Sequence, residues 1–347
     1  MPKLSYSKAG VDLERVRVIQ RSLGEQMGAT FAFRKGRRGV PTMPIGHYGG
    51  VIDIGGGDWL TLHTDGVGTK VLVAQEMKKF DTVGIDCVAM TVNDLICLGS
   101  EPVALLDYIA LEREDDALVK ELGKGLVEGA RAASVAIVGG ETAVMNDVIK
   151  GIGGRGFDLA AMGVGIVRPE CIIDGSAIVE GDAILGVASS GLHSNGYTLA
   201  RRVLKGRSLR EWDPSLGSTL GDALLTPTSI YVKPAMEALK RLDVHGIAHV
   251  TGGSFSKLSR LTGGRNLIFD IALPQPPEIF RLLSESGGIA EREMYRTFNM
   301  GTGLCLCLPE SELRRAARIF GHSGFKAYRI GTVKKGKGVK VNGVPIG

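Results

Sequence analysis

Apolar runs alternate with Gly-rich turns along the whole chain, and their periodicities predict a mixed α/β (α+β) fold. Apolar residues recur at helical spacing over 12–27, directly behind Asp12, which is a suitable N-cap. The other predicted helices cover 71–78, 81–98, 114–133, 198–204, 229–242, 255–261, 277–285 and 310–320. The predicted strands cover 59–64, 102–111, 134–138, 157–168, 182–188, 266–271, 303–308 and 327–333.

A domain boundary is predicted near Pro169, where an apolar strand ends and a new run begins. It divides the chain into residues 1–168 and 169–347, each with α/β patterning. Residues 31–57 are rich in Gly, Pro and basic side chains, so we expect a long loop or arm that could fold over a ligand. The tail is expected to end in a hairpin at Asn342-Gly343.

The hexapeptide Asp65-Gly66-Val67-Gly68-Thr69-Lys70 joins a predicted strand to a predicted helix. A helix N-terminus attracts phosphate through its free N–H groups and its dipole. The adjacent carboxylate would repel that phosphate unless a divalent cation lay between them. On this stretch alone, a magnesium–phosphate site and a simple turn whose Asp caps the helix are equally good interpretations.

The predicted helix over 81–98 is apolar except for a few polar side chains, Asp86, Asn93 and Asp94 among them. Burying an adjacent Asn-Asp pair without partners is costly. The pair could be satisfied by nearby backbone groups, or it could contact a metal or ligand. Because two polar groups fall together in an apolar helix, the sequence favours metal or ligand contact.

Three further Gly-rich segments carry candidate chemistry. Gly139-Gly140-Glu141 follows a predicted strand and repeats the pattern of a strand, a Gly turn and a carboxylate, so Glu141 is a candidate second metal ligand. His193 lies among small polar residues between a strand and a helix, where contact with a ligand and a surface role are equally good interpretations. The turn over 249–254 precedes a predicted helix and is a second candidate phosphate site.

Composition narrows the function classes. The 347 residues are 44% hydrophobic and 23% charged with a net charge of +5, and the basic residues are scattered, which argues against nucleic-acid binding. The densest basic run, 34–38, reads as a solvated loop or an anion-binding entrance. Five cysteines without metal-like spacing indicate a reducing compartment, with Cys305 and Cys307 as buried thiols. With no apolar leader core and no membrane-length apolar run, we expect a cytoplasmic protein without a membrane partner.

Several common motifs do not occur. The chain has no Gly-x-x-x-x-Gly-Lys-Ser/Thr, His-Glu-x-x-His or Gly-x-Ser-x-Gly. Gly151 to Gly156 fits Gly-x-Gly-x-x-Gly, but it precedes a strand instead of joining a strand to a helix, so we interpret it as a flexible turn and reject dinucleotide binding.

In order along the chain, these motifs resemble the phosphoribosylformylglycinamidine cyclo-ligase family, also called aminoimidazole ribonucleotide synthetases. The resemblance covers nearly the whole chain and rests on the segments 5–6, 9–12, 65–70, 84–86, 93–95, 101–102, 139–143, 191–197, 230–233, 243–245, 247–253 and 293–299. The hexapeptide alone would indicate only the wider superfamily, which includes thiamine monophosphate kinase. The chain departs from the family pattern at Leu192, where a proline is expected, and at Ser254, where a third glycine is expected.

The resemblance implies a two-domain homodimer in which N-terminal strands build an intersubunit barrel, with a sandwich-like C-terminal domain. It implies that residues 1–168 bind ATP and Mg²⁺ and mediate dimerisation, and that residues 169–347 bind the substrate. The implied metal ligands are Asp65, Asp94 and Glu141, and the implied ATP or phosphate contacts are Gly66, Gly68, Thr69, Lys70, Gly139 and Gly140. The implied substrate contacts are Ser194, Asn195, Gly196, Thr251, Gly252, Gly253 and Asn299, and the implied catalytic residues are Asp65, Lys70, Asp94, His193 and Asn195.

The implied reaction belongs to purine biosynthesis and takes only small-molecule substrates. ATP phosphorylates the formyl amide oxygen of formylglycinamidine ribonucleotide, and the iminophosphate closes to 5-aminoimidazole ribonucleotide, releasing ADP and phosphate. Two alternatives stay open: another ATP-dependent phosphotransferase of the superfamily, and a nucleotide-holding module without activity. The segments 193–196 and 294–299 favour the cyclo-ligase over another phosphotransferase, and the retained acidic residues argue against an inactive module.

Overall fold

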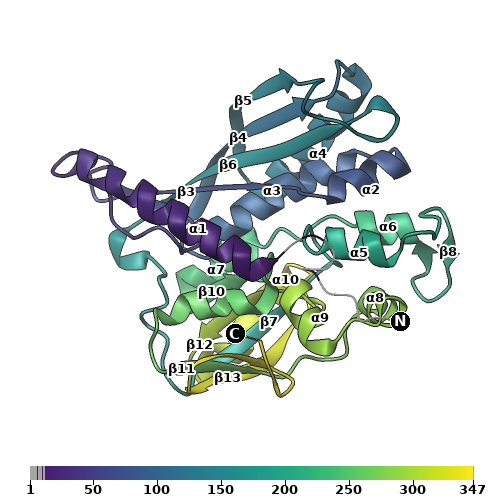
Figure 1. Ribbon diagram of the computed structural model, residues 1–347. Coiled ribbons are helices and arrows are strands. Elements are labelled where there is room, and N and C mark those ends of the chain that lie inside the picture. Colours follow the sequence, from purple (N-terminus) through teal and green to yellow (C-terminus); the bar gives the residue numbers. More distant parts are fainter. Residues whose placement is uncertain (1–5, 7–9, 11, 347) are drawn as a thin grey trace.

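The computed structural model describes Tyr6, Gly10 and residues 12–346, which form two sheet-and-helix units (Figure 1). The described residues of the first unit end with strand β6 (Phe157–Val167), and the second unit begins its sheet with β7 (Ala183–Ala188). A short 3₁₀ turn, Pro169–Cys171, lies between them.

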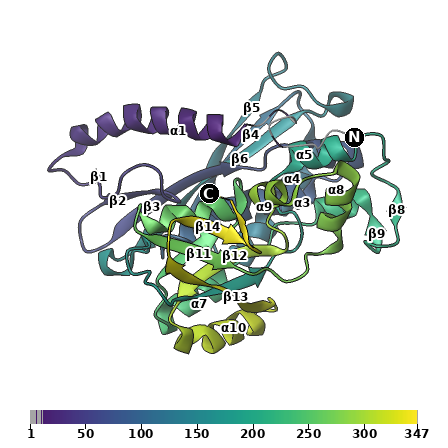
Figure 2. The same ribbon diagram turned by 60° about the horizontal axis from the view of Figure 1, so that its bottom comes forward.

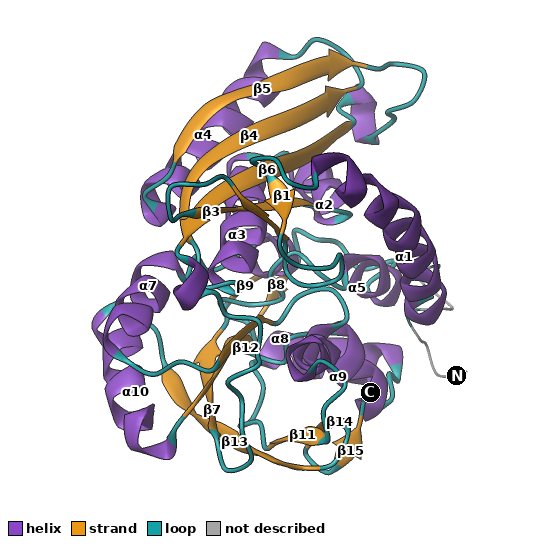
Figure 3. Ribbon diagram, turned by 90° about the vertical axis from the view of Figure 1, so that its left-hand side faces the viewer, coloured by secondary structure: helices purple, strands orange, loops and turns teal. Residues whose placement is uncertain are grey.

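The first sheet is mixed and has the strand order β1-β2-β3-β6-β4-β5. Its other strands are β1 (Val40–Pro41), β2 (Gly50–Asp53), β3 (Trp59–Gly66), β4 (Glu101–Leu111) and β5 (Ala136–Val144). Helices α3 (Asp81–Ile96) and α4 (Asp116–Ala133) cover one face, as Figure 3 shows. Side chains of β6 alternate strictly between buried and more exposed, because the opposite face of this sheet carries no helix.

The second sheet has the order β10-β12-β7-β13-β11-β14-β15. Its other strands are β10 (Gly246–His249), β11 (Leu267–Ile271), β12 (Thr302–Leu308), β13 (Ala327–Lys335), β14 (Gly338–Val341) and β15 (Val344–Pro345). Helices α7 (Val232–Arg241) and α10 (Leu313–His322) pack together, and α10 packs on β7 and β13 (Figure 2). Every residue of β12 is buried, Cys305 and Cys307 included, which confirms the prediction of buried thiols.

The remaining helices are shorter or lie outside the two helix layers described above. They are α1 (Leu13–Gly28), α2 (Lys70–Met77), α5 (Tyr197–Val203), α6 (Leu220–Leu225), α8 (Glu278–Gly287), α9 (Glu291–Thr297) and the 3₁₀ helices η1 (Ala29–Arg34), η2 (Ile152–Gly154), η4 (Ser254–Thr262) and η5 (Glu310–Glu312). A two-stranded ribbon, β8 (Trp212–Asp213) with β9 (Ser218–Thr219), precedes α6. Helix α1 begins at the predicted N-cap, where the Asp12 carboxylate accepts the backbone N–H groups of Glu14 and Arg15.

Most predicted elements are confirmed, and three predictions need correction. The stretch 31–57 is not one long loop, because β1 and β2 add to the edge of the first sheet there. Gly139 and Gly140 form no turn, because β5 runs through them. The helix predicted over 255–261 is a 3₁₀ helix, η4. Within the described residues, no helix is long and apolar enough to span a membrane.

Candidate active site

One strand, β3, and one helix, α3, bring three potential metal ligands together. His63 and Asp65 lie two residues apart on β3 and therefore share a face, and Asp94 comes from α3, which packs against that face. His63 Nε2 lies 3.4 Å from Asp94 Oδ2 and 4.0 Å from Asp65 Oδ2. One ligand atom from each of the three side chains lies within 4.8 Å of the other two. The predicted pairing of Asp65 with Asp94 is thus present, with His63 as an unforeseen third member.

Asp94 is buried and surrounded by positive or polar groups from the second unit. Its Oδ1 lies 2.7 Å from Nδ1 of the fully buried His249, and its Oδ2 lies 3.7 Å from Nζ of Lys257. Burial alone would raise the pKa of Asp94, but Lys257, His249 and His63 together hold it well below its ordinary value. Asp94 is therefore a permanent carboxylate at the junction of the two units.

The residues present fit a divalent cation. Asp65 Oδ1 accepts a hydrogen bond of 2.8 Å from the backbone N–H of Gly66. The other carboxylate oxygen, Oδ2, lies on the side of His63. His63 Nε2 is buried and makes no hydrogen bond with any described residue. Two carboxylate oxygens and an imidazole nitrogen are all groups that bind divalent ions. The chemistry of this donor set thus matches a metal site.

Lys70, which is predicted as a phosphate contact, does not face this cluster in the structure. The side chain is fully buried, and Nζ lies 2.7 Å from Asp86 Oδ2, 3.0 Å from the His193 carbonyl oxygen and 2.8 Å from the Thr226 carbonyl oxygen. An ammonium has three donors, and three oxygens already surround this one. Lys70 therefore ties the hexapeptide to the second unit and leaves no donor for a phosphate.

Glu141 is also placed elsewhere. Cross-strand pairing aligns Glu141 with Tyr108 and aligns Gly140 with Asp107, and strand neighbours share a face. Asp107 pairs with Ala161, which pairs with Asp65, so Glu141 lies on the opposite, open face of the sheet. It is also three strands away from β3, about 14 Å at the usual strand spacing. The predicted set Asp65, Asp94 and Glu141 is therefore not assembled within one chain.

Gly139 and Gly140 accompany Glu141 on the edge strand, so they do not join the Asp65 turn either. A Cβ on Gly140 would lie 2.4 Å from the Asp107 carboxylate, so this glycine gives room to a neighbouring side chain. By contrast, Gly68 and Thr69 are exposed at the start of α2, directly after β3, the strand that carries His63 and Asp65. Gly68 has φ +67°, which turns the chain from β3 into α2, and Gly66 ends β3.

The loop after β7 brings the predicted substrate residues to the same junction. His193 is fully buried, has φ +62°, and its ring lies beside those of Tyr231 and His249. Its Nε2 accepts a long hydrogen bond of 3.4 Å from the Ser190 N–H, and its Nδ1 has no partner among the described residues. Burial, with His249 and Lys70 nearby, holds the pKa of His193 well below its ordinary value. The ring is therefore neutral at pH 7.

Other predicted substrate contacts divide into two groups. Asn195 lies against the turn over 251–253, since a Cβ on Gly252 would come 3.0 Å from its Oδ1. Thr251 is buried and accepts a hydrogen bond from Lys257, and Gly253 begins η4. These residues meet near Asp94.

The second group, Ser194, Gly196 and Asn299, makes contacts within the protein. Ser194 Oγ lies 3.2 Å from the Thr228 hydroxyl, and Gly196 packs beneath Phe298. The Asn299 amide donates to the Gly191 carbonyl and accepts from the Ser189 hydroxyl. The structure thus shows Asn299 shaping the loop.

Asp86 and Asn93 join the two units through backbone contacts. Asp86 Oδ1 accepts the N–H and the hydroxyl of Thr228 at 2.7 and 2.6 Å. Asn93 donates to the Ser229 carbonyl at 2.8 Å and accepts the Tyr231 N–H at 3.0 Å. Asn93 thus bonds to backbone groups, although these are not nearby in sequence and come from the second unit.

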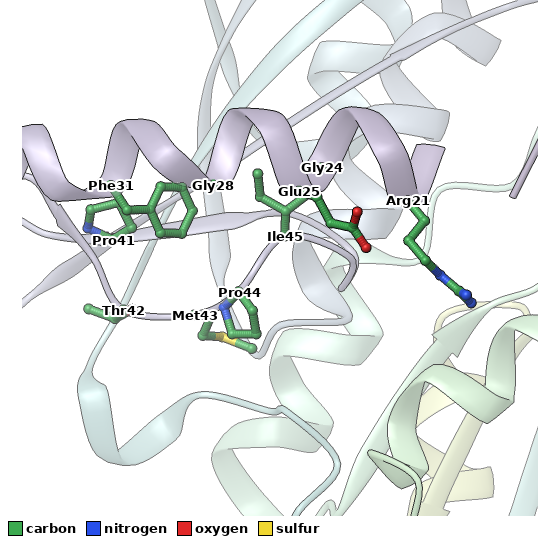
Figure 4. Close-up of a pocket in the computed structure, with 10 residues that line it drawn as sticks. All are labelled: Arg21, Gly24, Glu25, Gly28, Phe31, Pro41, Thr42, Met43, Pro44 and Ile45. Carbon is green, nitrogen blue, oxygen red and sulfur yellow. The ribbon is translucent and has the colours of Figure 1, made fainter. Parts of the chain in front are cut away.

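A hollow leads from the surface toward His63. One part, about 560 Å³, lies between α1 and residues 41–45, and Figure 4 shows Phe31 and Ile45 facing it. A second part of about 350 Å³ shares several of these residues and is also lined by His63 and Thr64. The segment predicted as an arm over a ligand therefore walls a hollow that reaches the cluster.

Three residues of the site were not predicted: His63, His249 and Lys257. His63 had a usable signal, because residues i and i+2 of a strand share a face and His63 precedes Asp65 by two positions. His249 and Lys257 flank the Gly turn over 251–253, but no local pattern shows that they approach Asp94, more than 150 residues earlier.

The chain was compared with known proteins. Residues 46–167 match the AIR synthase related protein N-terminal domain, and residues 179–344 match its C-terminal domain. Phosphoribosylformylglycinamidine cyclo-ligase from Thermococcus kodakarensis is 44% identical over 97% of this chain and 98% of its own. The chain belongs to the phosphoribosylformylglycinamidine cyclo-ligase family. The enzyme of that name from Methanosarcina barkeri is 46% identical over 92% of both chains. The resemblance seen in the sequence is thereby confirmed.

Solved structures show the fold more widely. Thiamine monophosphate kinase from Aquifex aeolicus has a TM-score of 0.60 at 16% identity and covers 94% of this chain and 98% of its own. A structure of the hydrogenase maturation protein HypE in complex with ATP has a TM-score of 0.58 at 22% identity, over 80% of this chain and 77% of its own. At these identities the likeness establishes the two-unit fold alone.

Proposed function

We propose that the protein catalyses the ATP-dependent cyclisation of formylglycinamidine ribonucleotide to 5-aminoimidazole ribonucleotide, with release of ADP and phosphate. Family membership over the full chain supports this reaction. The structural observation that carries it is the contact between Asp94 from the first unit and His249 and Lys257 from the second. It brings the predicted ATP half and the predicted substrate half, 1–168 and 169–347, to one place.

In this proposal the ATP γ-phosphate is transferred to the formyl amide oxygen, and the amidine nitrogen then closes the ring on the iminophosphate. Asp65 and Asp94 would hold Mg²⁺, which would neutralise charge on the transferred phosphate. Gly66, Gly68 and Thr69 lie in the turn from β3 into α2 and would contact the phosphates. Thr251, Gly252, Gly253 and Lys257 would take the ribose phosphate.

His193 and Asn195 would orient the amide. Because the His193 ring is neutral, it acts through a hydrogen bond at its unpartnered Nδ1 and not as an imidazolium acid. His193 is fully buried, so substrate reaches it only if the loop over 189–197 moves. That movement would also shield the iminophosphate from water.

The open face of the first sheet supports a homodimer. Apolar side chains on strands β4 and β6 of this face are 37–40% exposed, namely Leu106, Tyr108, Met162 and Ile166. A second copy packed face to face would cover them and complete an intersubunit barrel. A cytoplasmic location stays a prediction.

One assay tests the reaction. Purified protein receives Mg-ATP and formylglycinamidine ribonucleotide, and ADP and the imidazole product are measured together. Equal amounts of both support the cyclo-ligase. ADP without imidazole would favour a phosphotransferase, and neither product would contradict an ATP-dependent reaction on this substrate.

A further inference from the structure

The cluster of His63, Asp65 and Asp94 contains a nitrogen that the sequence did not assign to any role. His63 lies on β3 with its side chain 16% exposed, on the wall of the hollow beneath residues 41–52. Its Nε2 is buried and has no hydrogen-bond partner among the described residues. The nitrogen is instead surrounded by two carboxylates, whose nearest oxygens lie 3.4 Å (Asp94) and 4.0 Å (Asp65) away.

Each of the two carboxylates turns its Oδ2 toward this nitrogen, and Asp94 Oδ2 also lies 3.7 Å from Lys257 Nζ. Asp94 gives Oδ1 to His249 at 2.7 Å, and Asp65 gives Oδ1 to the Gly66 N–H at 2.8 Å. The remaining oxygens, both Oδ2, are the ones that lie 3.4 and 4.0 Å from His63 Nε2. Second groups that fix one oxygen of a carboxylate and leave the other free are typical of metal sites.

The distances fit a shared ion better than a direct ion pair. A charge-assisted N–H···O hydrogen bond has a length of about 2.7–2.9 Å, shorter than either separation here. An ion with bonds of about 2.1 Å holds neighbouring ligand atoms about 3 Å apart and opposite ones about 4.2 Å apart. The separations of 3.4 and 4.0 Å fall inside that interval.

His245 offers an internal comparison, because it also lies between two carboxylates. Its Nδ1 is 2.7 Å from Asp182 Oδ2 and its Nε2 is 3.2 Å from Asp243 Oδ2. Each nitrogen thus contacts one carboxylate directly, at a shorter distance than either separation at His63. The open geometry at His63 is therefore not a general consequence of placing histidine beside aspartate in this chain.

We propose that His63 is a nitrogen ligand of the divalent cation held by Asp65 and Asp94, so that the site accepts imidazole-binding ions such as Mn²⁺ and Co²⁺ as well as Mg²⁺. This inference rests on the proposed function, which supplies the cation with ATP. Mg²⁺ prefers all-oxygen ligand sets, whereas imidazole suits the transition metals. A histidine ligand therefore shifts the selectivity of the site toward Mn²⁺.

The test uses the full-length protein with ¹⁵N-labelled histidine, Mn²⁺ and a non-hydrolysable ATP analogue. Pulsed electron paramagnetic resonance detects a ¹⁵N coupling when a histidine nitrogen binds Mn²⁺. We expect this coupling in the wild type, its loss in His63→Gln, and its retention in His245→Gln. Mn²⁺ affinity should fall by at least about tenfold in His63→Gln, with a smaller change for Mg²⁺.

Bound Mn²⁺ without a ¹⁵N coupling, a coupling that survives in His63→Gln, or no Mn²⁺ binding at all would overturn the inference. Circular dichroism and thermal unfolding verify that His63→Gln is folded, and His63→Asn provides a second variant if it is not. Cyclisation with Mg-ATP is measured on the same wild-type preparation. Activity without the coupling would contradict the His63 ligand alone, whereas the coupling without activity would contradict the proposed reaction alone.

Discussion

Replacing Lys70 with methionine separates a structural tie from a phosphate contact. In the structure, Lys70 Nζ and Asp86 form an ion pair in which both side chains are fully buried. Burial lowers the pKa of Lys70, and Asp86 opposes that shift. Removing one member of a buried pair leaves an uncompensated charge and costs about 3–5 kcal/mol. The carbonyl oxygens of His193 and Thr226 also lose their donor, which adds to the cost.

The assay is equilibrium unfolding in urea, followed by circular dichroism. With a slope of about 1–3 kcal/mol per molar urea, the midpoint for Lys70→Met should fall by about 1 M or more. Lys78→Met, at the exposed end of the same helix, should change stability by no more than about 0.5 kcal/mol. ATP affinity is measured on the same proteins. An unchanged midpoint combined with a specific loss of ATP affinity would refute the structural tie and restore the phosphate contact.

Three further predictions follow from the same contacts. Asp94→Asn should lower ATP turnover by at least about a hundredfold while circular dichroism stays native; normal turnover would exclude Asp94 from the metal site. The pKa of His245 is raised because Asp182 and Asp243 outweigh burial. The stabilising contribution of His245 to folding is therefore complete below its unfolded pKa of about 6.5 and is lost as pH rises through its folded pKa. The difference in melting temperature between wild type and His245→Gln should accordingly shrink from pH 5.5 to pH 9, and a constant difference would contradict this. Met162→Lys on the open face should convert a dimer to a monomer in light scattering, unlike Val127→Lys on the exposed side of α4; a dimer in both variants would exclude this face.

Elements with a clear period were predictable from the sequence, and short or Gly-rich ones were not. The helix over 81–98 and the strand over 102–111 appear as α3 and β4, because burial imposes their patterns directly. Strands β1 and β2 have two and four residues among Gly and Pro, too short to show an alternation. They form because the exposed edge of β3 offers backbone partners, which is a tertiary effect.

In the site too, residues with a local sequence signal were predictable, whereas contacts between distant segments were not. Asp94 could be predicted as a candidate ligand because burying a carboxylate in an apolar helix is costly unless it has partners. The contacts of Lys70 could not be predicted, because the carbonyl oxygens of His193 and Thr226 lie 123 and 156 residues away. Gly140 was misread as a turn because a glycine that makes room for Asp107 looks the same in sequence as one that adopts a positive φ.

The hexapeptide over 65–70 therefore serves both units at once. Asp65 at its start faces His63 and Asp94, whereas Lys70 at its end is buried against the His193 carbonyl. Gly68, with its positive φ, reverses the chain between them and makes the two directions compatible. This turn therefore joins the Asp65 carboxylate, beside His63 and Asp94, to the backbone of the loop that carries His193.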